Sequence, residues 1–278
     1  MLSDFRRLFA APADLSGCAD WAGGSRRVYH TFMTRAASVP AETDRLCEGC
    51  GYVLNGLPED GRCPECGKPL EESAATLRRD PDWEREDATS SGLRRFSRTA
   101  AACIFRPTPF FRSLSVRPDR TRSRRFARLH WMIAGALFGL CAWTHFRWIR
   151  SLNGTRDSWP DRLLLLAFVA GAYVFLAGLN RIAAALTTYE ATFRGIRLPL
   201  PVVLRGLDYH AAHYLPVALV TACTVVGYSA FHAAAPLTAS LYATVYLYVL
   251  CAEAVLAAVY LFKTYWIAMK NLMYANRE

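Results

Sequence analysis

The stretch LHWMIAGALFGLCAWTHF (residues 129–146) decides the fold, because it contains no Asp, Glu, Lys or Arg. About 20 predominantly apolar residues suffice to carry a helix across the roughly 30 Å hydrocarbon core of a bilayer. Trp131 and Trp148 bracket the stretch, and aromatic side chains favour both membrane–water interfaces. The sequence therefore predicts a transmembrane helix here.

Three further stretches have the same character, at residues 163–179, 214–231 and 237–262. The helix of the second can continue beyond the membrane to Phe193. Pro236 suits the first turn of the fourth helix, where its missing N–H costs nothing. KTYWIAMKNLMY (residues 263–274) is too polar for a fifth span. We expect a mainly α protein with a four-helix transmembrane domain over residues 129–278.

Charge is concentrated just before the first span. The chain of 278 residues has a net charge of +10 and is 53% hydrophobic, which excludes disorder over its whole length. Residues 88–128 contain 11 arginines and a single acid, Asp119. The positive-inside rule places this segment in the cytosol. Four spans then return the C-terminus to the same side, so both termini are expected in the cytosol and the protein in the cell (inner) membrane. The loop after the first span opposes this orientation with four arginines.

Residues 1–44 show no sustained periodicity, and we expect them to be disordered. LFAAPA (residues 8–13) is shorter than the apolar core of a secretory signal. Met33 is an alternative initiator.

Four cysteines, in the pattern C-x2-C-x12-C-x2-C, define a module over residues 45–72: Cys47, Cys50, Cys63 and Cys66. Two such pairs brought together form a tetrahedral four-sulfur metal site. Gly51 and Gly67 follow the pairs, where a positive φ directs backbone N–H groups at sulfur. VLNGLPEDGR (residues 53–62) predicts a short β-hairpin. A pair of disulfides is the alternative, but it requires an oxidising compartment rather than the cytosol.

The string CEGCGYVLNGLPEDGRCPECG (residues 47–67) resembles zinc ribbons, and its CGY and CPECG turns also resemble rubredoxin-type iron sites. The x12 spacing resembles the rubredoxin domain of rubrerythrins, which serves a di-iron centre built with Glu-x-x-His ligands. Neither Glu190 nor Glu253 has a histidine three residues later. Zinc is therefore the favoured metal, and iron is the alternative.

The linker, residues 73–128, contains a predicted basic amphipathic helix. Its apolar positions recur at helical spacing: Leu93, Phe96, Ala100, Cys103 and Ile104. Such a helix can lie on an anionic leaflet, with anionic lipid as its partner. PFFRSL (residues 109–114) offers a second apolar wedge through Phe110, Phe111 and Leu114. Nucleic acid is an unlikely partner, because the segment lacks aromatic stacking platforms and adjoins a span.

RPTPFFRSL (residues 106–114) and LPLPVVLRGLDYHAAHYLP (residues 198–216) each lead towards a span. Over residues 103–262 the chain resembles the Yip-type (Rab-interacting-protein-like) membrane proteins, whose bacterial relatives often carry an N-terminal CGY…CPECG ribbon. The resemblance implies a non-enzymatic role in membrane organisation or trafficking and no catalytic residue. That family usually has five spans, whereas four are counted here.

Glu253 is the only acidic residue within the apolar stretches, and intramembrane acids are candidate functional groups. Its expected partners are Arg181, His210, His213 and His130. No phosphate loop, nucleophile elbow, HExxH or dinucleotide motif is present, so no enzyme activity is expected. We expect a scaffold or adaptor that binds an unknown protein partner through the ribbon. The alternatives are a rubredoxin-like electron-transfer protein, or a small transporter or proton channel that uses Glu253.

Overall fold

The computed structural model describes residues 39–85, 91–152, 159–234 and 239–276, without the side chains of 151–162 and 232–242. Most of the N-terminal segment expected to be disordered lies outside these ranges. The described residues form α-helices, short 3-10 turns and isolated bridges, and they contain no extended strand. The mainly α fold predicted from the sequence is confirmed.

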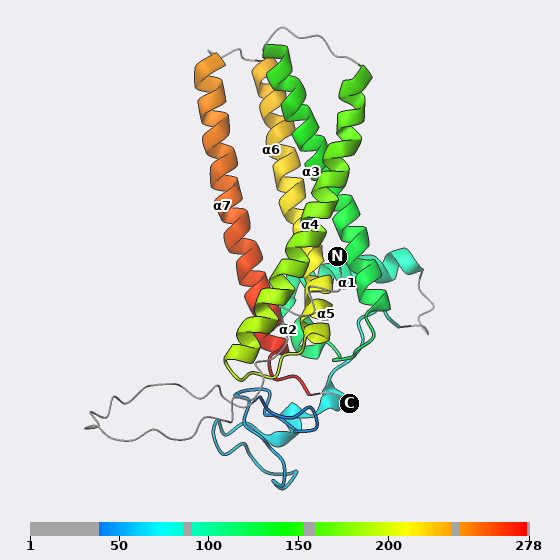
Figure 1. Cartoon of the computed structure of the whole chain (residues 1–278), viewed down its shortest axis with the longest axis vertical. Coiled ribbons are helices and arrows are strands. Elements are labelled where there is room, and N and C mark those ends of the chain that lie inside the picture. Colours follow the sequence, from blue (N-terminus) through cyan, green and yellow to red (C-terminus); the bar gives the residue numbers. More distant parts are fainter. Residues whose placement is uncertain (1–38, 86–90, 153–158, 235–238, 277–278) are drawn as a thin grey trace, which may run out of the picture. The chain divides into compact units, whose positions relative to one another are not determined.

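Four long helices make up the bundle in Figure 1: α3 (Thr121–Leu152), α4 (Trp159–Phe193), α6 (Tyr214–Ala234) and α7 (Ala239–Leu272). By length and composition, four segments can cross a membrane: Thr121–Arg150, Leu163–Phe193, Leu200–Phe231 and Ala243–Leu272. The four predicted long apolar helices are confirmed, and this architecture fits a multi-pass membrane protein. Each helix extends beyond its apolar stretch, and α4 continues to Phe193 as predicted.

Helices α3 and α4 approach closely at two glycines of α3. A Cβ atom on Gly139 would lie 2.6 Å from the backbone N and Cα of Val169, and one on Gly135 would lie 3.1 Å from the backbone N of Tyr173. Small residues four positions apart permit such close packing between membrane helices, where no hydrophobic effect drives association. The sequence GALFG therefore sets the distance between the two spans.

Most of the buried core lies at one end of the bundle, where the shorter elements gather (Figure 1). These are η1 (Leu70–Ser73), η2 (Ala75–Leu77), α1 (Gly92–Phe105), α2 (Pro107–Ser113), α5 (Leu200–His210) and η3 (Ala211–His213). Large side chains such as Phe111, Phe126 and Tyr209 are fully buried there. Along the spans, by contrast, apolar side chains such as Tyr248 and Leu256 of α7 remain 72% and 70% exposed. Exposed apolar side chains over a span-length helix suit contact with lipid.

The predicted amphipathic helix exists as α1, and most of its apolar face packs inside the protein, whereas Leu93 at its start is 78% exposed. Ala100 and Cys103 are buried, and the Phe96 ring stacks on His130 of α3 with a centroid separation of 4.6 Å. The second wedge is wrong for Phe111 and Leu114, which are 0% and 1% exposed. These side chains are covered by neighbouring helices, which bury them more completely than a bilayer surface would.

A buried polar network joins the linker to α5 through Arg205, which is 2% exposed. Its guanidinium donates to Glu84 Oε2 at 2.7 Å and to the backbone oxygens of Ser115 and Asp119 at 3.0 and 3.1 Å. The hydroxyl of Tyr209 donates to the other oxygen of Glu84. A buried charge requires paired partners, and the network thereby joins Glu84, Ser115 and Asp119 of the linker to α5.

Candidate metal centre

The four-cysteine module consists of two matching turns, one at each C-x2-C pair. The amide of Gly51 donates to the Cys47 carbonyl at 2.8 Å, and the amide of Gly67 donates to the Cys63 carbonyl at 2.9 Å. Both glycines have positive φ, +82° and +71°, as the sequence predicts. Antiparallel bridges close each turn, Leu46 with Val53 and Arg62 with Pro69.

The hairpin predicted within residues 53–62 is therefore wrong in its register. Pairing occurs around each C-x2-C turn, and residues 53–62 form turns that connect the two. The physical reason is that each metal-binding turn itself reverses the chain. The flanking residues are thereby brought side by side, and the connecting segment bonds back to them, as where the Leu54 amide donates to the Arg45 carbonyl at 2.7 Å.

The turns bring the four sulfur atoms together. Sγ of Cys47 lies 3.5 Å from Sγ of Cys66, and Sγ of Cys50 lies 3.6 Å from Sγ of Cys63. All four ligand atoms lie within 4.8 Å of one another. A tetrahedral ion with metal–sulfur bonds of about 2.3 Å separates its sulfurs by about 3.8 Å. The cluster therefore fits one four-coordinate metal ion; its geometry suits zinc and iron alike.

The protonation of the thiols differs across the cluster. Desolvation and the neighbouring thiols raise the pKa of Cys50 to about 12, against a hydrogen bond from the Tyr52 amide. At Cys63, burial acts to raise the pKa, but amide donors from Cys66 and Glu65 outweigh it and lower the pKa to about 7. A metal ion must displace the remaining protons, because only thiolates bind it.

The C-terminal residues clamp the module. Asn276 is buried: its side-chain oxygen accepts from the Leu46 amide at 2.8 Å, and its amide donates to the Leu46 carbonyl at 2.7 Å and to the Ser73 carbonyl at 2.8 Å. The Tyr274 ring lies against Gly51, where a Cβ would come within 2.5 Å of the ring. The module is thus fixed to the segment that follows α7.

Arg78 provides a second attachment and is 5% exposed. It donates to Glu48 Oε1 at 2.7 Å, to the Leu114 carbonyl at 3.0 Å and to the Asn271 carbonyl of α7 at 3.0 Å. Sequence reasoning missed Arg78 and Asn276, since neither lies in a motif and their partners are distant along the chain.

Glu253 lies on α7, but its partner differs from those predicted. Its carboxylate accepts from the hydroxyl of Thr221 of α6 at 2.5 Å, and its other oxygen is buried without a partner among the described residues. The predicted histidine partners bond elsewhere: His210 with Thr264, and His213 with Tyr260. Tyr260 follows Glu253 on α7 by about 10 Å, at 1.5 Å per residue. His213, which bonds to Tyr260, is therefore held away from Glu253.

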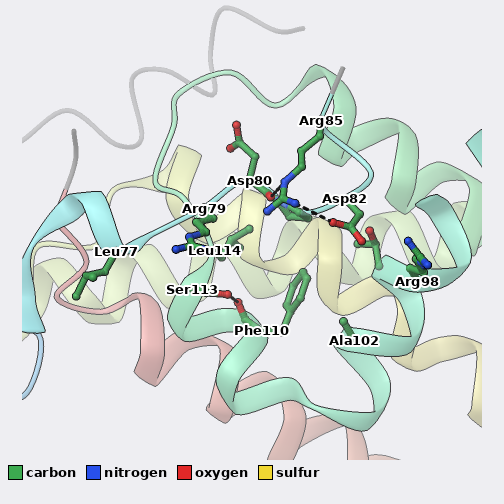
Figure 2. A pocket seen from close by; sticks show the side chains of 12 residues that line it. Leu77, Arg79, Asp80, Asp82, Arg85, Arg98, Ala102, Phe110, Ser113 and Leu114 are labelled. Carbon is green, nitrogen blue, oxygen red and sulfur yellow. Dashed lines mark hydrogen bonds and ion pairs between the residues drawn. The ribbon is translucent and has the colours of Figure 1, made fainter. Parts of the chain in front are cut away.

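A cleft of about 410 Å³ lies beside α1 and α2 (Figure 2). Its walls hold three arginines and two aspartates, and both aspartates are paired. Arg85 lies 3.3 Å from Asp82, and Asp80 pairs with Arg117 at 2.8 Å. Both acids of this cleft are thus already paired, and its three arginines leave it with a net charge of one positive.

Comparison with known proteins finds no matching family model, no matching curated protein and no matching solved structure.

Proposed function

We propose that this chain is a non-enzymatic multi-pass protein of the cell (inner) membrane, a scaffold or adaptor whose four-cysteine module is a cytosolic protein-binding head. Zinc is the proposed metal, and its role is structural: Cys47, Cys50, Cys63 and Cys66 hold it and it cross-links the two turns. The proposal is supported most by one observation, the four-sulfur cluster fixed to the membrane helices by Asn276 and Arg78.

The outer face of the module indicates the chemistry of the protein partner. Tyr52 and Val53 are each 39% exposed, and three exposed acids lie nearby in the sequence, Glu59, Asp60 and Glu65. Apolar anchors among acidic side chains suit a partner with a basic surface. A structural zinc keeps such a face rigid, which lowers the entropy lost on binding.

The test is in-cell crosslinking of the full chain, with Glu59, Asp60 and Glu65 reversed to Lys in one variant. We expect the variant to insert into the membrane and retain its metal but to lose its protein crosslinks. Reversal of Arg94, Arg98 and Arg125 to Glu serves as a matched charge control elsewhere on the surface. Identical crosslinks in wild type and the acid-reversed variant would contradict the adaptor role.

A rubredoxin-like electron-transfer role is the second candidate, favoured by the exposure of Cys66, which would bring an iron close to the surface. Visible absorbance that bleaches on reduction would support it. Colourless protein containing zinc, purified from iron-replete cells, would exclude it.

A proton or ion pathway is the third candidate, and the unpartnered oxygen of Glu253 favours it. Its test is flux into liposomes that contain Glu253→Gln protein. Wild-type flux lost in the variant would support the pathway, whereas equal flux would dismiss it.

A further inference from the structure

A second, smaller pocket lies between α3, α4 and α5 at the end of the bundle that carries the core. Its volume is about 320 Å³. Its walls are built from both charged and apolar side chains: Arg120, Arg124, Trp131, Asn180, Arg181, Ala185, Leu200, Leu204 and Asp208. Three guanidinium groups and a single carboxylate give it a net charge of two positives, against one positive in the cleft of Figure 2.

Two of the three cations are free to bind a ligand. Arg124 and Arg181 are exposed and make no side-chain hydrogen bond or ion pair within the described parts of the chain. The third, Arg120, donates to Asp208 Oδ2 at 2.8 Å, and Ser123 donates to the same oxygen at 2.9 Å. The acid in the pocket is therefore held by Arg120, with the charge of Arg124 also acting on it, whereas the hydrogen-bond donors of Arg124 and Arg181 remain unused.

The pocket also contains buried polar atoms without partners in the described structure. Trp131 Nε1 is an unpartnered donor; Asn180 Oδ1 and Asp208 Oδ1 are unpartnered acceptors. Their residues are only 6%, 2% and 1% exposed. Nε of Arg120 is also buried without a partner, so four such atoms belong to the residues of one pocket. Buried polar groups are normally hydrogen-bonded, and these four therefore indicate a missing partner that both accepts and donates hydrogen bonds.

The apolar surroundings indicate that this partner has hydrocarbon chains. Leu200 and Leu204 form part of the pocket wall, and on the same helix as Arg181 the side chains of Ile182 and Leu186 are 59% and 64% exposed. Asn180 and Arg181 end the apolar stretch of α4, which is the depth at which phospholipid headgroups lie. A charged pocket at this depth, continuous with an exposed apolar helix face, matches a lipid.

We propose that this pocket binds the headgroup of an anionic glycerophospholipid through its phosphate group. The phosphodiester oxygens accept hydrogen bonds from Arg124, Arg181 and the indole N–H of Trp131, since guanidinium pairs well with phosphate. Hydroxyl donors of the headgroup satisfy Asp208 Oδ1 and Asn180 Oδ1, so phosphatidylglycerol fits better than phosphatidic acid. The proposal rests on the membrane placement proposed above, but not on the adaptor role or the metal.

The test is native mass spectrometry of the full chain in uncharged detergent, titrated with phosphatidylglycerol, phosphatidic acid, phosphatidylcholine or inorganic phosphate. We expect phosphatidylglycerol to bind most tightly and phosphatidylcholine to bind weakly. Arg124→Gln and Arg181→Gln should each lower the affinity about five-fold, the factor that corresponds to about 1 kcal/mol per arginine at an anionic surface. Trp131→Phe, which keeps an aromatic ring but removes the N–H, should also weaken binding.

Arg125→Gln is the matched control, because Arg125 is the exposed neighbour of Arg124 on α3 and does not line the pocket. It removes the same charge and should leave binding unchanged. Equal losses in Arg124→Gln and Arg125→Gln, or no retention of any phosphate compound, would overturn the proposal. Inorganic phosphate bound as tightly as lipid, and lost in the same variants, would support the phosphate site and assign its ligand to the cytosol instead.

Discussion

Arg205 is the side chain of the linker network whose replacement should cost the most stability. It lies on α5, is 2% exposed, and meets Glu84, which is more than one hundred positions away in the chain. Removing one partner of a buried ion pair leaves the other charged and desolvated, which costs more than the pair contributes. The network therefore makes the linker depend on α5, although no covalent or metal bond joins them.

Replacing Arg205 with Met should destabilise the protein by about 3–5 kcal/mol, because Glu84 would be left buried and unpaired. The measurement is denaturant unfolding in detergent. Arg117→Gln is the control, since Arg117 pairs with Asp80 of the same region at 2.8 Å but is 52% exposed. An exposed ion pair contributes about 1 kcal/mol or less. Equal effects of the two substitutions would contradict the role assigned to Arg205.

Asn276 shows what a sequence cannot reveal at the residue scale. Its side chain pairs with the Leu46 backbone as a strand neighbour would, across 230 positions. Hydropathy and motif spacing report on neighbours along the chain and carry no signal for such a contact. The four cysteines were predictable for the opposite reason. Each short C-x2-C turn fixes two ligand positions locally, and the cluster then requires only that the two turns come together.

At the scale of elements, the transmembrane helices were predictable because their burial partner is the bilayer itself. A span requires only a sufficient run of apolar residues, so composition alone locates it. Helix α1 shows the limit of that reasoning. Its amphipathic pattern predicted a helix correctly, but the pattern does not specify whether lipid or protein covers the apolar face. The structure covers most of that face with α2, α5 and η3 and with the Phe126 and His130 rings of α3, which sequence periodicity could not indicate.

The close contact between α3 and α4 at Gly139 can be tested by substitution. Gly139→Ala places a methyl group 2.6 Å from the Val169 backbone, so the helices must separate. Overpacking of this kind costs about 1–3 kcal/mol. Gly178→Ala of α4 is the control, since a Cβ there meets nothing within 4 Å. Thermal unfolding in detergent should show a lower Tm for Gly139→Ala only; a similar fall in both would refute the close contact.

At the scale of the whole molecule, residues Ala36–Glu278 form one compact unit. The four-cysteine module, the linker and the membrane helices share buried contacts through Asn276, Arg78 and Arg205. A metal ion in the module therefore acts on more than a local turn. Because the module abuts the segment after α7, loss of the metal should also loosen the C-terminal residues, which hold Leu46 in place.

Metal analysis of the purified full chain is the most direct test of the account. We predict one zinc ion per chain in the wild type and none in Cys50→Ser, with full occupancy in the control Cys223→Ser, whose cysteine lies exposed on α6. Zinc in the wild type should also raise the Tm relative to chelator-treated protein, since metal binding contributes to folding. A wild-type chain without zinc or iron, or a Cys50→Ser chain that retains its metal, would contradict the account.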